Sequence, residues 1–159
     1  MSSQVLSTQA IEDLGLAAWI RFLRAHAAVT RQLSARLESQ HGLTLNDYDV
    51  MVQLYFAADR RLRRVDLARK VLLTASGITR LLDGLERAGW VEKARCTSDG
   101  RVTYAVLTDS GAAKFEEARE THLADLRELF SDRFTGKEQA TLADLLARLP
   151  LADAGACNE

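Results

Sequence analysis

Small and polar side chains at the start of a predicted helix, residues 75–88, are suited to contacts with nucleic-acid bases and phosphates. The first turn, residues 75–77, contains only small side chains, which let the end of a helix approach base edges closely. Thr79 and Arg80 can then donate hydrogen bonds to bases or phosphates. Taken alone, this helix is equally consistent with an ordinary exposed amphipathic helix. The residues expected to contact DNA here are Thr74, Ala75, Ser76, Gly77, Thr79 and Arg80.

A predicted β-hairpin follows this helix and places an arginine on its polar tip. Strands are expected at residues 90–94 and 103–107, where polar and β-forming residues alternate, with an Asp-Gly turn in the tip between them. An arginine on a narrow tip suits the minor groove of DNA, whose negative potential attracts it, and an acid two residues earlier can orient its guanidinium. The alternative is a solvated hairpin with a local ion pair. The expected contacts in and around the hairpin are Arg63, Arg95, Ser98, Asp99 and Arg101.

Positive charge is concentrated in this part of the chain, although the formal net charge of all 159 residues is only −1. Residues 1–59 carry 4 basic and 6 acidic side chains, and residues 105–159 carry 6 basic and 11 acidic ones. Residues 60–104 carry 11 basic and 5 acidic side chains, a net charge of +6. Such a local field can hold a polyanion even when the whole chain is nearly neutral. The pattern therefore predicts duplex DNA as the partner and argues against a surface that contacts only another protein.

The elements that must position these residues are mainly helical, because apolar residues recur at steps of three or four along most of the chain. A charged connector at residues 59–64 is expected to hold one short strand. Two short helices followed by a hairpin, within residues 62–108, have the order of a winged helix-turn-helix. The predicted fold class is mainly α with a small β-hairpin wing and a separate helical lobe. Helices are expected over residues 7–40, 45–58, 65–71, 75–88, 109–130 and 136–149.

Gly42 and Gly89 are expected to end the first and fourth helices, capping boxes to begin at Thr44 and Thr135, and Thr74 to cap the fourth helix. On the fourth helix Asp83 is expected to face outward, and the expected inward stripe consists of Ile78, Leu81, Leu82 and Leu85.

Three motifs in the middle of the chain resemble those of the MarR family of bacterial transcription regulators. They are the helix end Leu85-Glu86-Arg87-Ala88-Gly89-Trp90-Val91, the hairpin tip Asp99-Gly100-Arg101 and the helix start Leu107-Thr108-Asp109-Ser110-Gly111. The resemblance implies a homodimer on a palindromic operator, with a wing beside each recognition helix. It also implies that the helices at residues 11–37 and 123–149 of two protomers intertwine.

This resemblance divides the chain into four segments. Residues 7–42 are expected to be an N-terminal dimerisation helix, and residues 44–108 the winged helix-turn-helix DNA-binding domain. Residues 109–150 are expected to be C-terminal dimerisation helices, and residues 151–159 a flexible tail. Val65 departs from the family pattern, because many relatives have serine or threonine as the cap of the third helix.

The resemblance further implies that a small aromatic or anionic effector loosens a repressor from its DNA by binding between the dimer helices and the DNA lobe. Aromatic and imidazole side chains between two lobes can grip an aromatic carboxylate. The alternative is that such residues only pack in the core or at an interface. The candidates are Trp19, His26, Tyr48 and His122.

Cysteine, histidine and nucleophile patterns favour neither an enzyme nor a metal site. Cys96 and Cys157 are too far apart for a zinc site or a disulfide framework. Cys96 lies beside the hairpin, so a redox role is one alternative, but with Arg95 as its only clear basic neighbour a passive strand cysteine is expected. No catalytic residue, metal ligand or cofactor is expected. No apolar run reaches the roughly 20 residues of a membrane span, and residues 1–10 lack signal-peptide features, so a cytoplasmic protein without a membrane partner is expected.

Overall fold

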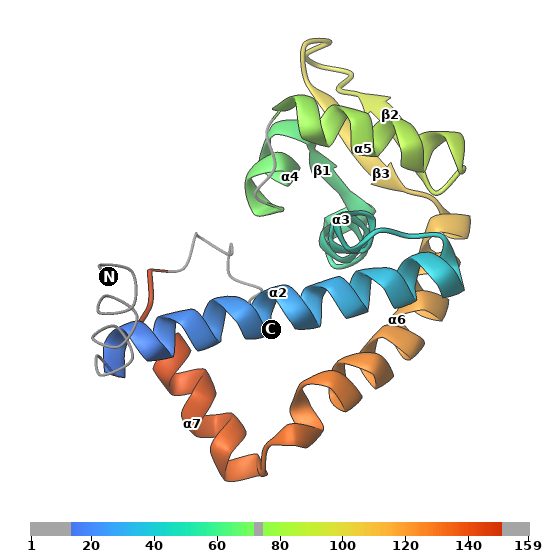
Figure 1. Cartoon of the computed structure of the whole chain (residues 1–159). Coiled ribbons are helices and arrows are strands. Elements are labelled where there is room, and N and C mark those ends of the chain that lie inside the picture. Colours follow the sequence, from blue (N-terminus) through green and yellow to red (C-terminus); the bar gives the residue numbers. More distant parts are fainter. Residues whose placement is uncertain (1–13, 72–74, 151–159) are drawn as a thin grey trace, which may run out of the picture.

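The computed structural model describes residues 14–71 and 75–150, which form helices around a small three-stranded sheet (Figure 1). This confirms the predicted fold class of a mainly helical chain with a β-hairpin. The elements in chain order are α2 (Leu14–His41), α3 (Leu45–Tyr55), η1 (Ala58–Arg60), β1 (Arg61–Arg63), α4 (Arg64–Lys70), α5 (Ala75–Arg87), β2 (Val91–Arg95), β3 (Thr103–Leu107), α6 (Asp109–Leu129), η2 (Ser131–Arg133) and α7 (Gly136–Leu146). The predicted helix start near residue 7, the Thr74 cap and the tail at residues 151–159 lie outside the described residues.

The sheet is antiparallel, with the strand order β1-β3-β2. β3 is the central strand, and its side chains Ala105 and Leu107 are buried in the core. β1 is the short strand expected in the charged connector, and β2 pairs with β3 from Val91 opposite Leu107. β2 starts one residue later than predicted, because the amide of Trp90 still closes the end of α5 with a 3.0 Å bond to the carbonyl of Leu85.

Glycines and capping boxes end and start the helices where the sequence predicts them. Gly42 and Gly89 adopt φ angles of 67° and 78°, in the left-handed region where glycine lets a chain turn away from a helix end. Thr44 and Thr135 each accept a hydrogen bond from the third residue of the following helix, whose acidic side chain bonds back to the cap. These caps involve only residues close in sequence, so local patterns are sufficient to predict them.

Two boundaries around the connector between α3 and α4 differ from the prediction. α3 ends three residues early, since Asp59 and Arg60 adopt left-handed φ angles of 53° and 51° and a short 3-10 turn takes the place of further α-helix. α4 begins at Arg64, so its cap residue is Arg63, whose side chain makes no capping hydrogen bond. The interpretation of Val65 as the cap of this helix is therefore wrong.

The core lies between α3, α5, the sheet and the first half of α6. Phe115 of α6 is fully buried and stacks near Tyr48 of α3, with ring centres 5.4 Å apart. Of the predicted inward stripe of α5, Ile78, Leu82 and Leu85 are each at most 3% exposed, and Leu81 is half-buried against the core. Burial of this stripe sets the rotation of α5 and thereby decides which of its side chains face outward.

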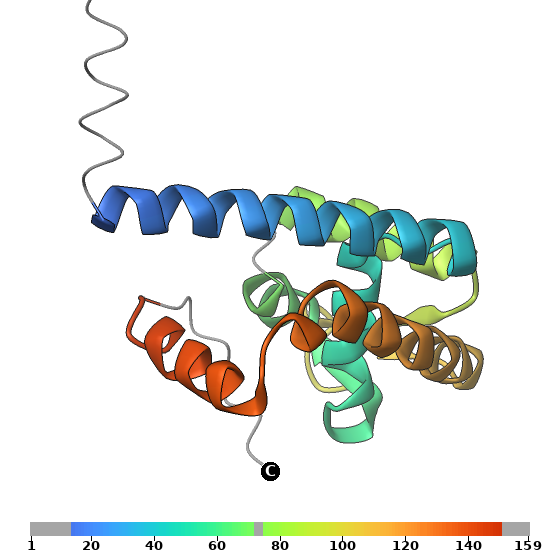
Figure 2. The same ribbon diagram turned by 60° about the horizontal axis from the view of Figure 1, so that its bottom comes forward.

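A second lobe consists of α2, α6 and α7, which outline an open triangle beside the sheet-containing lobe (Figures 1 and 2). Arg36 of α2 holds α6 through ion pairs of 2.6 Å to Asp125 and 2.9 Å to Glu128. No helix in the described part of the chain combines the length and apolar character that a membrane crossing needs. Large apolar side chains are nevertheless exposed on this lobe. On α2 they are Leu14, Leu16, Trp19, Ile20, Phe22 and Leu23. In α7 there is Leu145, and Leu149 follows the end of that helix.

Candidate nucleic-acid interface

The outward face of α5 carries polar side chains singled out in the sequence. Thr79 and Arg80 are exposed immediately after the buried Ile78. The helix begins at residue 75, as predicted, and Gly77 in its first turn is half-buried. The exposed face of a helix with this composition can enter a major groove, which is wide enough to admit it.

A lysine on the wing fixes α5 against β2. Lys93 Nζ lies 3.0 Å from a carboxylate oxygen of Asp83 and 2.9 Å from one of Glu86, so it bridges two successive turns of α5. Its hydrogen bond holds the pKa of Asp83 below the usual value for aspartate. Asp83 faces outward on α5 as expected, and its contact joins the helix and the wing into one unit.

The tip of the wing is a tight turn that presents an exposed arginine. The carbonyl of Asp99 accepts a 3.0 Å bond from the amide of Val102, which places Gly100 and Arg101 at the centre of the turn. Gly100 has no left-handed φ angle, so this is not the two-residue Asp-Gly hairpin turn. Asp99 Oδ1 accepts from the backbone amide of Arg101 at 3.0 Å. The acid therefore shapes the turn, whereas the sequence suggested that it would hold the guanidinium.

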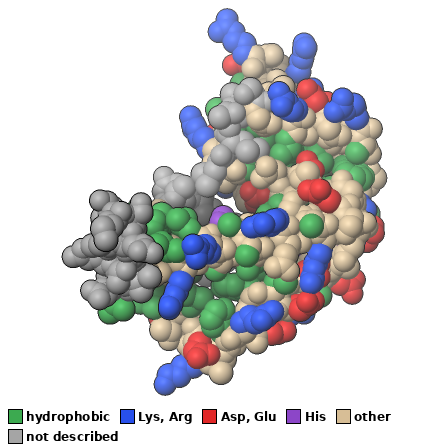
Figure 3. Space-filling model, in the orientation of Figure 1, with side chains coloured by type: hydrophobic (Ala, Val, Ile, Leu, Met, Phe, Trp, Pro, Cys, Tyr) green, Lys and Arg blue, Asp and Glu red, His purple; other side chains and the backbone are tan. Residues whose placement is uncertain are grey.

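The remaining predicted contacts lie along the strands. Arg95 is exposed at the end of β2, and Ser98 is exposed in the tip. Arg63 ends β1, and its hydrogen bond with the Tyr104 side chain raises its pKa. Arg61 belongs to none of the sequence motifs, and its guanidinium carbon lies over the Tyr104 ring, 4.6 Å from the ring centre. Figure 1 shows the hairpin projecting beside α5 at the end of the molecule remote from α7, and Figure 3 shows Lys and Arg side chains standing out at that end.

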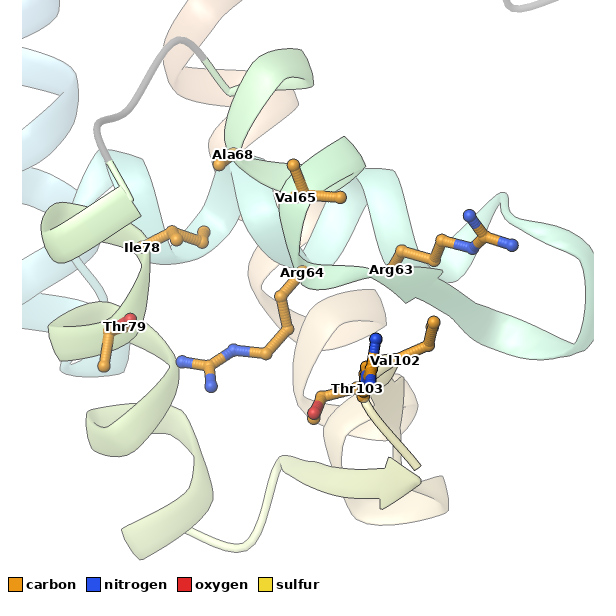
Figure 4. Close-up of a pocket in the computed structure, with 9 residues that line it drawn as sticks. Arg63, Arg64, Val65, Ala68, Ile78, Thr79, Val102 and Thr103 are labelled. Atoms are coloured by element: carbon orange, nitrogen blue, oxygen red, sulfur yellow. The ribbon is translucent and has the colours of Figure 1, made fainter. Parts of the chain in front are cut away.

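An open hollow of about 410 Å³ separates α5 from the wing (Figure 4). Of the predicted contact residues, Arg63, Thr79 and Arg101 line it. Apolar side chains of α4 and α5, among them Val65 and Ile78, also line it. Arg64 also lines the hollow, but it belongs to none of the sequence motifs. Three segments that are far apart in the chain form the hollow, so no local pattern predicts which residues line it.

Cys96, which follows β2 directly before the tip of the wing, has a more acidic thiol than its sequence neighbours suggest. Its Sγ lies 3.1 Å from the Ser98 hydroxyl. That hydrogen bond, with further bonds from the backbone at Asp99 and Ser98, lowers the pKa of the thiol. The cause is hydrogen bonding in the turn and not a basic side chain, so composition alone does not reveal it.

The four candidate effector residues fall into two groups. Tyr48 and His122 are both buried, with ring centres 4.4 Å apart, and burial lowers the pKa of His122. Trp19 and His26 lie on the exposed half of α2, each beside Phe22 at 6.1 and 6.4 Å between ring centres. None of the four lines the hollow. Within the described residues no three candidate metal ligands come together.

Known proteins similar to this chain are DNA-binding regulators. A family model described as transcriptional regulator SarA/Rot matches residues 32–118. The HTH-type transcriptional repressor YetL of Bacillus subtilis is 33% identical over 111 residues, which are 68% of this chain and 66% of YetL. The crystal structure of AbsC, a MarR family regulator from Streptomyces coelicolor, matches with a TM-score of 0.79 and 30% identity, over 84% of this chain and 90% of AbsC.

A complex with DNA is known for another similar structure. Sco3205, a MarR family regulator from Streptomyces coelicolor that was crystallised in complex with DNA, matches with a TM-score of 0.78 and 28% identity. The match covers 82% of this chain and 85% of Sco3205. Together with the exposed face of α5 and the basic wing, these similarities show that the chain is a DNA-binding transcription regulator and not an enzyme. The chain belongs to the MarR family of winged helix-turn-helix transcriptional regulators.

Proposed function

We propose that the protein is a homodimeric repressor that binds a palindromic operator and releases it when a small aromatic or anionic effector binds. The observation that carries the proposal is the position of two elements with exposed arginines, α5 with Arg80 and the wing tip with Arg101, at one end of the molecule (Figure 1). A helix fits the major groove, and an arginine on a narrow tip fits the neighbouring minor groove. The proposed contacts are Arg63, Thr74, Ala75, Ser76, Gly77, Thr79, Arg80, Arg95, Ser98, Asp99 and Arg101.

The exposed apolar faces of the second lobe support a homodimer. Leu14 is 84% exposed and Trp19 is 54% exposed on α2, while Leu145 on α7 is 48% exposed. A monomer in water rarely exposes a large contiguous apolar surface, and such surfaces mark interfaces. Figure 3 shows hydrophobic side chains gathered at the end of the molecule where α2 and α7 lie. We assign residues 7–42 and 109–150 to dimerisation and residues 44–108 to DNA binding.

A dimer of this kind constrains the operator. Two recognition helices on one face of B-DNA are separated by one helical turn, about 34–36 Å, so the half-sites should be centred about 10 base pairs apart. Two-fold symmetry of the protein then requires a palindromic sequence.

The contact between Tyr48 and His122 supports control by an effector. Tyr48 belongs to α3 in the DNA lobe and His122 to α6, so this ring contact joins the two lobes. A ligand that inserts an aromatic ring at this junction would change the angle between the lobes and hence the spacing of the recognition helices. Trp19 and His26 on α2 are the further candidates for contact with the effector.

Replacing Arg80 by alanine is expected to reduce both affinity and sequence preference. Arg80 is exposed on α5, where a guanidinium can bond to the edge of a guanine, and one such contact discriminates against a wrong base by about 1–3 kcal/mol. The measurement is fluorescence anisotropy on the operator and on operators with single base changes. An equal loss on every sequence would reassign Arg80 to a phosphate contact.

The proposal as a whole is tested by selecting genomic fragments on the purified protein and titrating the recovered site with salt. We expect a palindrome that binds two protomers, with an affinity that falls steeply between about 50 and 200 mM salt, since each phosphate contact releases counterions. Sedimentation of the free protein is expected to give a dimer. Recovery of no preferred sequence, or an affinity independent of salt, would contradict DNA recognition and favour a winged helix that binds proteins.

A further inference from the structure

Arg64 is a basic residue that the sequence motifs leave aside, and its guanidinium lies inside the hollow between α4, α5 and the wing. Figure 4 shows its side chain extending from the start of α4 toward Thr79 of α5. Arg63, its neighbour in sequence, points away from α5 in the same view. Arg64 is thus directed into the space between the two elements that are proposed to enter the DNA grooves.

One nitrogen of the Arg64 guanidinium lacks a hydrogen-bond partner among the described residues. This atom, Nη2, is covered by protein. Buried polar groups in folded proteins are nearly always hydrogen-bonded, and an exception is commonly satisfied by water or by a bound ion. Among residues 14–71 and 75–150, Arg64 forms no salt bridge.

The carboxylates on the neighbouring face of α5 already have another partner. Asp83 and Glu86 both pair with Lys93, at 3.0 and 2.9 Å. The hydrogen bond from Lys93 holds the pKa of Asp83 below its usual value, and the positive charge of Arg64 adds to this effect. The Arg64 guanidinium therefore lies close enough to the Asp83 carboxylate for the two charges to interact. Because Lys93 takes the hydrogen bond, Arg64 keeps an unpaired positive charge at the hollow.

The surroundings of the hollow favour an oxyanion from DNA as its occupant. Arg63 and Arg101 line the hollow with Arg64, and no Asp or Glu is among its lining residues. A sugar-phosphate backbone separates the major groove from the minor groove. If α5 enters one groove and the wing the other, that backbone must pass in front of the space between them. This space is the hollow (Figure 4).

We propose that the hollow receives a backbone phosphate of the bound operator and that Arg64 is the residue that binds it. The inference rests on the proposed function and adds a contact outside the recognition helix and the wing tip. A phosphate contact carries no base information, so Arg64 sets affinity and register, while α5 and the wing tip read the sequence.

The test is the salt dependence of operator binding by Arg64→Met. The slope of the logarithm of affinity against the logarithm of salt concentration should become shallower by about 0.9 for each protomer that loses a phosphate contact. If the affinities of wild type and variant converge near 1 M salt, this amounts to an affinity loss of about eight-fold per protomer at 0.1 M salt. The loss should be the same on operators with altered bases.

Two variants separate a phosphate contact from other effects. Arg119→Met removes the same charge from an exposed position on α6, outside the DNA lobe, and should leave the slope unchanged. Arg64→Lys keeps the charge and should retain most of the slope. The thermal midpoint of Arg64→Met should change little, because Arg64 forms no salt bridge among the described residues and its Nη2 atom has no hydrogen-bond partner to lose. A lower midpoint with an unchanged salt slope would mean that Arg64 has a structural role, and the proposal would fail.

Duplexes with a neutral methylphosphonate at one linkage at a time identify the phosphate. In each half-site, one methylphosphonate position should weaken binding by the wild type and leave binding by Arg64→Met unchanged. Equal losses by both proteins at every linkage would overturn the assignment. Replacing chloride by inorganic phosphate at constant ionic strength should affect both proteins equally, whereas a larger effect on wild type would show that a free anion occupies the hollow. If wild type binds no duplex at all, the proposed function itself fails, a result distinct from all of these.

Discussion

Replacing Gly111 by alanine is expected to destabilise the fold by at least about 3 kcal/mol, at the upper end of the usual cost of overpacking. A Cβ at this position would lie 2.0 Å from the carbonyl oxygen of Trp90 and 2.9 Å from Cδ1 of Leu107. The Trp90 carbonyl cannot easily move, because it accepts a 3.1 Å bond from the amide of Thr108. The adjoining carbonyl of Gly89 accepts bonds of 2.8 and 2.9 Å from the hydroxyls of Thr108 and Ser110.

The measurement is urea denaturation at one fixed protein concentration, since dimerisation would make stability depend on concentration. Gly84→Ala is the matched control. Gly84 lies inside α5, and a Cβ there meets nothing within 4 Å. This change should stabilise the helix by about 0.5–1 kcal/mol, because alanine has the better helix propensity. Similar effects of the two substitutions would show that the collision at Gly111 does not exist in solution.

Replacing Arg101 by alanine is expected to weaken operator binding by about 1–3 kcal/mol while the dimer stays intact. Arg101 is exposed, and its backbone is fixed by the bond from its amide to Asp99. The side chain is therefore presented on a shaped turn, and insertion into a narrow minor groove costs little additional ordering. Anisotropy with the operator measures the affinity, and sedimentation measures the oligomeric state. An unchanged affinity would eliminate the minor-groove role.

Two further duplexes and one further variant make this test specific. If Arg101 reads the width of the minor groove, replacing A·T pairs under the wing by G·C pairs should weaken wild type but hardly affect Arg101→Ala. Asp99→Ala keeps the arginine but removes the acceptor that shapes the turn. It should give an intermediate loss. A larger loss for Asp99→Ala than for Arg101→Ala would mean that the shape of the tip matters more than its charge.

Local patterns were sufficient to predict much of the fold. Gly42, Gly89 and the two capping boxes act through residues within a few positions of each other, and all are found in the structure. The inward stripe of α5 follows from helical periodicity in the same way. Gly111 also stood in a recognised motif, but the reason for glycine there is a carbonyl more than twenty residues earlier in the chain, which only the folded structure reveals.

Features that depend on distant segments could not be predicted from the sequence. The left-handed angles of Asp59 and Arg60 occur in residues with no glycine signal, and α3 ends three residues before its predicted end. The sequence suggested that the Asp99 carboxylate would bind the Arg101 guanidinium, but in the structure it accepts a bond from the Arg101 backbone amide. The reason is that the turn is centred one residue later than an Asp-Gly turn would be. Arg64 lacked any local motif, since α4, α5 and the wing meet around it only after folding.

The bonds from Thr108 and Ser110 to the Gly89 carbonyl have a mechanical consequence. They fasten the first turn of α6 to the end of α5, so the two helices turn together about this joint. α6 has 21 residues and is about 31 Å long at 1.5 Å per residue. A sideways shift of about 2 Å at its far end is a rotation of roughly 4°, which carries the first turn of the 13-residue α5 through roughly 1 Å. We therefore expect a small displacement in the helical lobe to move the DNA-facing end of α5 by a distance that is large enough to disturb its hydrogen bonds to DNA.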